Sequence, residues 1–323
     1  MNWKLKASLQ KLLHFTKIGD KLNHIPATLK KDYHKNVCLY QAYECLRKFD
    51  ETQHSTTVTS SGVEMKTGNT KTALEIGTGY SLISPVILHL LGFDKIITVD
   101  ISKDVSIKTF QKQIKHIDHD DFLTRIAAKS TFSSTEIKEK IAQLQSFQTL
   151  KSLFESCNIT YIPKYTLSDI EKQSTSFDYI CSQVVFEHIP PTFLTELFQK
   201  MKSWLTKDGF AVHTINFIDH FTNPGFFQDK NISEFNFLKY SDKTWKYWAG
   251  NDIAYTNRLS YLFYLELCKE NDLTVIDFKG ENYRAHNPLS ADEIHEDVIK
   301  KYKQLQNVKD VCRYQRGTLI FKK

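Results

Sequence analysis

The chain has 323 residues, of which 41% are hydrophobic and 25% charged, so it can bury a substantial core as ordinary globular proteins do. We expect no membrane-spanning segment and no secretory signal, because no apolar stretch is long and continuous enough. The six scattered cysteines form no Cys-x-x-Cys pair, which favours reduced thiols in a cytoplasmic protein over a zinc site, and the net charge of +6 suits an anionic partner without singling one out.

The first fifty residues are predicted to be helical, with amphipathic spacing in 3–15 and again in 37–49. Lysines crowd the first helix and the residues after it. This helix could lie on a membrane surface or meet a lipid-linked substrate, or it could simply pack its leucines on the core. Residues 51–70 are rich in Ser, Thr and Gly and are predicted to form a loop. We therefore separate an N-terminal region, 1–71, from a domain spanning 72–323.

The domain begins with a short apolar strand that breaks into a glycine turn at Gly77 and Gly79, after which Ser81 can cap a helix. A second apolar strand over 96–99 ends at Asp100. A carboxylate at that position can accept hydrogen bonds from both hydroxyls of a ribose. Glycine turn and strand-end acid together predict a site for a nucleoside cofactor.

The glycine pattern narrows the choice of cofactor. Leu82 stands where a dinucleotide fingerprint needs its third glycine, and the chain has no phosphate-binding G-x-x-x-x-G-K-[ST] run. The run Glu-x-Gly-x-Gly followed by a strand-end Asp resembles the class I S-adenosylmethionine-dependent methyltransferases. The resemblance implies S-adenosylmethionine as cofactor, with the turn facing its amino-acid part and the acid holding its ribose. The implied cofactor-binding residues are Glu75, Gly77, Thr78, Gly79, Asp100 and Ile101.

Strands and helices alternate through the rest of the chain. Residues 102–157 form an insertion with helical spacing in 107–117, 122–128 and 137–154. Further strands are predicted at 158–162, 177–185, 210–215, 273–278 and 317–321, and further helices at 192–205, where Asp208-Gly209 follows as a stop, and at 258–271. This alternation predicts an α/β fold with a doubly wound, mostly parallel sheet. Seven strands ending in an antiparallel pair match the methyltransferase order.

Ligands of open α/β sheets bind at the carboxyl ends of the strands, and histidines follow two strands here. Glu187-His188 looks like the Glu-His-hydrophobic segment of many small-molecule methyltransferases. Members that methylate DNA or RNA amino groups carry an Asn- or Asp-Pro-Pro-aromatic run there, so a nucleic-acid acceptor is not expected. A histidine can take the proton of a hydroxyl, and we choose His220 as the first candidate for this base and His188 as the second. The alternatives are a structural histidine bonded to a carbonyl, or a metal site; we assign no metal ligand.

Residues 219–257 form an aromatic-rich insertion that we expect to cap the substrate. The run Asn236–Ser241, followed by Trp245 and Tyr255–Leu259, resembles methyltransferase-like proteins of bacterial surface-polysaccharide and sugar-modification clusters. Aromatic faces stack on sugar rings, and polar side chains between them could hold hydroxyl, carboxylate or phosphate groups. The alternative is a cap that packs its aromatics internally. The predicted substrate-binding residues are His213, Asp219, Trp245, Tyr255, Asn257 and Arg258.

These patterns predict an O-methyltransferase that acts on a hydroxyl of a sugar or glycan-related metabolite. Two other functions stay open at this point: an RNA or protein methyltransferase, which the basic N-terminus would suit, and a non-catalytic scaffold with a methyltransferase fold. The acceptor itself and the oligomeric state do not follow from the sequence.

Overall fold

The computed structural model describes residues 1–14, 31–57, 70–117, 120–223, 228–251 and 253–323. Most of the loop predicted at 51–70 lies outside these residues. Residues 51–57 of the predicted loop are instead helical and belong to α3, Tyr33–Thr57. Its last turns are supported by the ion pair between Arg47 and Glu51, with Nη1 and Oε1 2.8 Å apart, and by the burial of Thr52.

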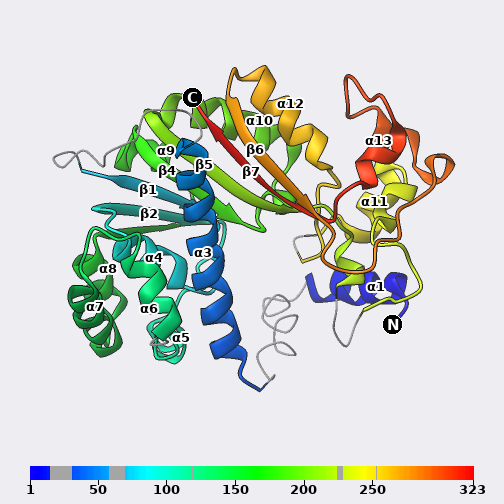
Figure 1. Ribbon diagram of the computed structural model, residues 1–323. Coiled ribbons are helices and arrows are strands. Elements are labelled where there is room, and N and C mark those ends of the chain that lie inside the picture. The colour runs from blue at the N-terminus through cyan, green and yellow to red at the C-terminus, as the bar shows by residue number, and fades with distance from the viewer. Residues whose placement is uncertain (15–30, 58–69, 118–119, 224–227, 252) are drawn as a thin grey trace. The chain divides into compact units, whose positions relative to one another are not determined.

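Seven strands form one sheet in the order β3-β2-β1-β4-β5-β7-β6 (Figure 1). The strands are β1 Thr72–Ile76, β2 Lys95–Asp100, β3 Ile159–Pro163, β4 Phe177–Gln183, β5 Leu205–Asn216, β6 Thr274–Glu281 and β7 Arg316–Lys322. The pairs β1–β2, β1–β4 and β2–β3 are parallel. Figure 1 shows β7 running against β6. The predicted α/β class with a mostly parallel sheet is confirmed.

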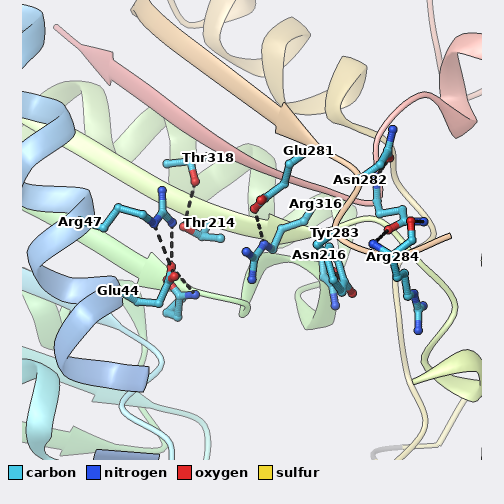
Figure 2. Close-up of polar contacts among 12 residues, drawn as sticks. Glu44, Arg47, Thr214, Asn216, Glu281, Asn282, Tyr283, Arg284, Arg316 and Thr318 are labelled. Carbon is cyan, nitrogen blue, oxygen red and sulfur yellow. Dashed lines mark hydrogen bonds and ion pairs between the residues drawn. The ribbon is translucent and has the colours of Figure 1, made fainter. Parts of the chain in front are cut away.

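Side chains on both faces of the central strands are buried, since helices cover the sheet. All five residues of β1 are buried, as are the last five of β2, which is why both strands are rich in apolar residues. Hydrogen bonds between polar side chains connect the later strands (Figure 2). The hydroxyls of Thr214 in β5 and Thr318 in β7 lie 3.2 Å apart. Arg316 of β7 likewise donates to Glu281 of β6 at 2.5 Å.

Helices connect the strands. They are α4 Ile83–Leu90, α9 Leu167–Gln173, α10 Pro191–Trp204 and α12 Tyr261–Glu270. Ser81 does not occupy the N-cap of α4 as predicted; Leu82 does, without a side-chain hydrogen bond. The Ser81 hydroxyl instead accepts from the Ile83 amide at 3.3 Å and donates to Gln113 at 3.0 Å. The predicted stop at Asp208-Gly209 is also wrong, because α10 ends at Trp204 and both residues lie within β5.

The insertion after Asp100 holds four helices, α5 Ile107–Ile114, α6 Asp120–Ala127, α7 Ser134–Ser146 and α8 Leu150–Cys157. The single helix predicted over 137–154 is therefore two. Ser133 starts α7 through a capping box with Glu136, and Thr149 caps α8 by accepting from the Ser152 amide at 3.1 Å. Phe147, between them, has an extended backbone.

The chain divides into two compact units. The first, here called the turn unit, comprises 31–183, 199–213 and 320–323, and the second, the cap unit, comprises 1–30, 184–198 and 214–319. The boundary predicted after residue 71 stays a prediction. All six cysteines are buried as free thiols. Within the described ranges, no helix combines the length and apolar character needed to cross a bilayer.

The cap unit contains α1 Trp3–His14, α11 Asp242–Ala249 and α13 Glu296–Ile299. Helix α1 packs on α11 and buries Trp3 and Ala7. Its leucines do not form the buried face, since Leu5, Leu9 and Leu12 are 61%, 42% and 68% exposed. The expectation that the leucines pack on the core is therefore wrong, because Trp3 anchors the helix by its other side. Contact of α1 with a membrane surface stays a prediction.

Candidate active site

The glycine turn after β1 leaves its backbone open to a ligand. Gly77 and Gly79 have φ values of 88° and 60°, a conformation that side chains other than glycine rarely adopt. The Gly77 amide donates to the carbonyl of Val99 at 2.8 Å, which fixes the turn beside β2. A Cβ built on Gly79 meets no atom within 4 Å. Open space therefore lies directly over the turn.

Asp100, at the end of β2, is held by the same turn. Its Oδ2 accepts from the Gly79 amide at 2.7 Å, and its Oδ1 accepts from the amide and the hydroxyl of Ser102, both at 2.9 Å. A carboxylate has about four lone-pair positions, so a ribose hydroxyl can still bind. The next side chain, Ile101, is apolar and 80% exposed, which leaves it free to cover a flat base.

Glu75 acts inside the turn unit. It is 6% exposed and accepts from the Thr98 hydroxyl at 2.7 Å, while that hydroxyl also lies 2.6 Å from the hydroxyl of Thr78. Burial raises the pKa of Glu75, and the hydrogen bond from Thr98 offsets part of this rise. Glu75 thus orders the turn through two threonines, and this geometry favours that role over direct contact with the cofactor.

These features agree with the comparison with known protein families. A family described as "Methyltransferase domain" matches residues 58–277, more than half of the chain. The chain belongs to this methyltransferase family. S-Adenosylmethionine is its cofactor, and when bound it supplies a methyl group on a sulfonium. The open turn at Gly79, the Asp100 carboxylate and the exposed Ile101 fit its amino-acid, ribose and base parts.

Solved structures resemble the methyltransferase at low identity. One is a protein from Galdieria sulphuraria described as a sarcosine dimethylglycine methyltransferase, with 14% identity, 88% of this chain and 85% of that chain covered, and a TM-score of 0.40. A second is a geranyl diphosphate methyltransferase, with 10% identity, 78% of this chain and 77% of that chain covered, and a TM-score of 0.36. A third is phosphoethanolamine N-methyltransferase 2 of Haemonchus contortus, with 15% identity, 84% of this chain and 52% of that chain covered, and a TM-score of 0.36. No curated protein matches the chain. The acceptors in these names belong to those proteins alone.

In the cap unit, the segment after β4 carries a buried acid beside two histidines. Val184 has a φ of 52°, which is an outlier for a β-branched residue, and a short 3-10 helix, Phe186–His188, follows. Glu187 is 3% exposed, and neither carboxylate oxygen has a hydrogen-bond partner of normal geometry in the described part of the cap unit. Burial raises its pKa to about 8, opposed by backbone amides of Glu187 and Asn216.

His188 and His220 lie together, with ring centroids 4.9 Å apart. The Nδ1 of His188 donates to the carbonyl of Tyr255 at 2.9 Å, so its Nε2 carries the lone pair of the neutral ring. Burial, followed by the nearby His188, Lys6 and Arg284, lowers the pKa of His220 to about 3. Both candidate bases are therefore brought together, and His220 is uncharged at neutral pH.

Asn257 holds the Glu187–His188 segment in place. Its side-chain amide donates to the carbonyls of Phe186 at 2.6 Å and Ile189 at 2.9 Å, and its backbone amide donates to the Glu187 carbonyl at 2.8 Å. With those donors used internally, Asn257 positions the acid rather than touching substrate. Tyr255 also acts through its backbone, because its carbonyl accepts the hydrogen bond from His188.

Arg258 is not placed to bind substrate as the sequence predicted. Its side chain is 3% exposed, and Nη1 donates to the carbonyls of Phe237 and Tyr240, each at 2.7 Å. Nη2 pairs with Asp242. The guanidinium therefore bonds to groups within the cap unit, and Arg258 stabilises this unit.

His213 lies within β5 and is fully buried. Its Nδ1 is 2.9 Å from the hydroxyl of Ser182 in β4, and its ring lies 5.6 Å from that of Phe321. This geometry favours the structural alternative for His213 over a substrate contact.

A small cavity of about 30 Å³ lies within the cap unit and is lined by three of the predicted residues, Asp219, His220 and Trp245. Asp219 accepts from the Phe221 amide at 2.9 Å and from Asn236 at 3.2 Å, and burial raises its pKa to about 6. It therefore does not orient His220. Trp245 is 4% exposed and stacks on Trp3 and Tyr240.

Sequence reasoning missed Lys6 and Arg284. Lys6 of α1 lines the cavity, and its Nζ lies 3.5 Å from the His220 carbonyl oxygen. Burial lowers the pKa of Lys6, although the nearby charge of Asp219 raises it in part. Arg284, labelled in Figure 2, donates to the carbonyl of Thr222 at 2.8 Å and to its hydroxyl at 2.7 Å. It thereby anchors the turn that carries His220. Lys6 lies three residues after Trp3 and therefore on the same side of α1, which is the signal in the sequence that it faces the cap.

Proposed function

We propose that this methyltransferase transfers the methyl group of S-adenosylmethionine to a hydroxyl of a sugar or glycan-related metabolite. The observation that carries the proposal is the cluster of Glu187, His188 and His220, hereafter the Glu-His-His cluster. A neutral hydroxyl is a weak nucleophile until its proton is removed, so its methylation needs a group of this kind.

Chain order supports a role for this cluster at the reacting edge of the sheet. Ile76, the last residue before the glycine turn, pairs with Ser182 of the parallel strand β4. Glu187 and His188 follow that strand within a few residues, and parallel α/β sheets bind ligands beyond the carboxyl ends of their strands. We propose that the acceptor hydroxyl meets the cluster there.

In its simplest form, the activation is a proton transfer to one histidine. His220 is the first candidate, because its ring lies beside that of His188 and its Nε2 is buried without a partner in the described residues. His188 is the second, since the Tyr255 carbonyl fixes its tautomer with the lone pair on Nε2. Positioning supplies the larger share of the acceleration.

The glycan class rests on the cap. Two of its aromatic residues, Phe221 and Trp245, line a small cavity together with Lys6 and Asp219. Aromatic surface with a few polar groups is the usual lining for sugars. A cytoplasmic location and contact of α1 with a membrane-borne acceptor belong to the same proposal.

The test is methyl transfer from labelled S-adenosylmethionine to a panel of nucleotide sugars, glycolipid precursors, bulk RNA and protein. Methylation of a sugar hydroxyl, with His220→Ala reducing kcat about 100-fold or more while S-adenosylhomocysteine still binds, is the expected outcome. Transfer to RNA with a steep salt dependence would point to the RNA alternative. Absence of any S-adenosylhomocysteine binding would point to a scaffold.

A further inference from the structure

We infer that Glu187, His188 and His220 bind a divalent transition-metal cation. The candidate ligand atoms of these three side chains all lie within 4.8 Å of one another. Ligand atoms bound to one such cation at about 2.0–2.2 Å stand roughly 3–3.5 Å apart. Closing the site therefore requires side-chain shifts of about 1 Å, which rotation of the exposed His188 and half-buried His220 can supply.

The buried carboxylate gives an independent reason for a cation. Glu187 is 3% exposed, and neither of its carboxyl oxygens has a hydrogen-bond partner of normal geometry in the described residues. A buried carboxyl group whose oxygens lack partners is costly, and a bound cation would supply the missing partner. The buried Nε2 of His220 is unpartnered in the same part of the chain.

The surroundings prepare the ligands. Metal-binding histidines usually donate their other ring N–H to a carbonyl or carboxylate, which fixes the tautomer, and His188 does so to Tyr255 at 2.9 Å. Asn257 holds the Glu187 backbone, and Arg284 holds the turn that carries His220. Each ligand thus comes from a segment that is fixed by hydrogen bonds outside the cluster.

The donor set indicates the class of cation. Two imidazoles and one carboxylate suit Mn²⁺, Fe²⁺, Co²⁺ or Zn²⁺, whereas Ca²⁺ and Mg²⁺ prefer oxygen ligands throughout. Three protein ligands leave open positions on such an ion. In this form of the reaction, which rests on the proposed function, the acceptor hydroxyl binds there and loses its proton to water, since the cation lowers its pKa. The oxygen then bonds to the methyl carbon as the carbon–sulfur bond breaks, and His220 serves as a ligand in place of a base.

The test uses tag-free, chelator-treated full-length protein without cofactor or acceptor. Calorimetry with Mn²⁺ and the visible absorption of added Co²⁺ measure the binding. We expect one ion per chain, with affinity reduced more than about 100-fold in Glu187→Gln and in His220→Ala, since even supporting residues of metal sites contribute 10–100-fold. The matched control is His116→Ala, which removes an imidazole from the turn unit. Circular dichroism and S-adenosylhomocysteine binding check that each variant is folded.

The inference would be overturned by no binding of Mn²⁺, Co²⁺ or Zn²⁺ at millimolar concentrations, or by binding that survives both cluster substitutions. Equal loss in His116→Ala would also overturn it, by showing that the ion binds elsewhere. These readouts need no methyl transfer, so their failure leaves the proposed acceptor class standing. Failure to methylate any hydroxyl, with the ion bound, would instead refute the proposed function.

Discussion

Replacing Asp100 by Asn should weaken cofactor binding strongly while sparing the fold. The carboxylate accepts from Gly79 on one oxygen and from Ser102 on the other, so the amide of Asn must turn its NH2 group toward one of these donors. It also removes the charge that a ribose hydroxyl would meet. A hydrogen bond to a charged group contributes about 1.5–3 kcal/mol, which corresponds to roughly a 10- to 150-fold rise in Kd for each hydroxyl held.

The assay is calorimetric titration with S-adenosylhomocysteine, supported by urea denaturation to measure the free energy of unfolding. Asp94→Asn is the matched control. Asp94 is also an acid that accepts from a backbone amide, that of Lys71 at 2.7 Å, but it precedes β2 and so stands at the opposite end of the strand. Unchanged affinity in Asp100→Asn, or equal loss in both variants, would refute the assignment of this carboxylate to the ribose.

Three further predictions concern the cap unit. Asn257→Ala should cut kcat about 10- to 100-fold with little change in S-adenosylhomocysteine binding, because it frees the segment that carries the buried acid; an unchanged kcat in steady-state assays would show that this clamp does not position the reacting groups. Arg258→Lys should lower the free energy of unfolding by about 2–4 kcal/mol in urea titrations, since one ammonium cannot reproduce the bonds to two carbonyls and a carboxylate. A raised KM at unchanged stability would instead restore Arg258 as a substrate ligand. Joint replacement of Leu5, Leu9 and Leu12 by Ser should reduce sedimentation with anionic vesicles without destabilising the protein, and equal sedimentation would remove α1 from any membrane contact.

The cofactor side of the site could be predicted because its signals are local. A buried strand, a turn and a strand-end acid are contiguous patterns, and each sets its own geometry. The positive φ angles of Gly77 and Gly79 follow from the residue type, and Asp100 reaches the turn because neighbouring parallel strands place their ends together.

The cap could not be predicted to the same degree, because its polar side chains bind partners far along the chain. Asn257 meets carbonyls about 70 residues away, and Lys6 reaches a carbonyl more than 200 residues away. An Asn or Arg among aromatics suits a sugar site and a buried clamp equally well in a sequence. Periodicity likewise shows that α1 has an apolar stripe, but the side that packs is decided by Trp3, whose partners lie in α11 and its neighbours.

Two unfavourable features coincide in the segment between β4 and α10. The left-handed backbone of Val184 costs on the order of 1–3 kcal/mol, and the buried, unpartnered carboxylate of Glu187 adds a desolvation cost three residues later. A segment that served only to connect strand to helix would gain stability by losing both. The hydrogen bonds from Asn257 offset part of the cost and hold the segment in this conformation. Natural sequences break local rules in this way chiefly where function requires it, so the strain supports the proposal that residues 184–188 belong to the functional site.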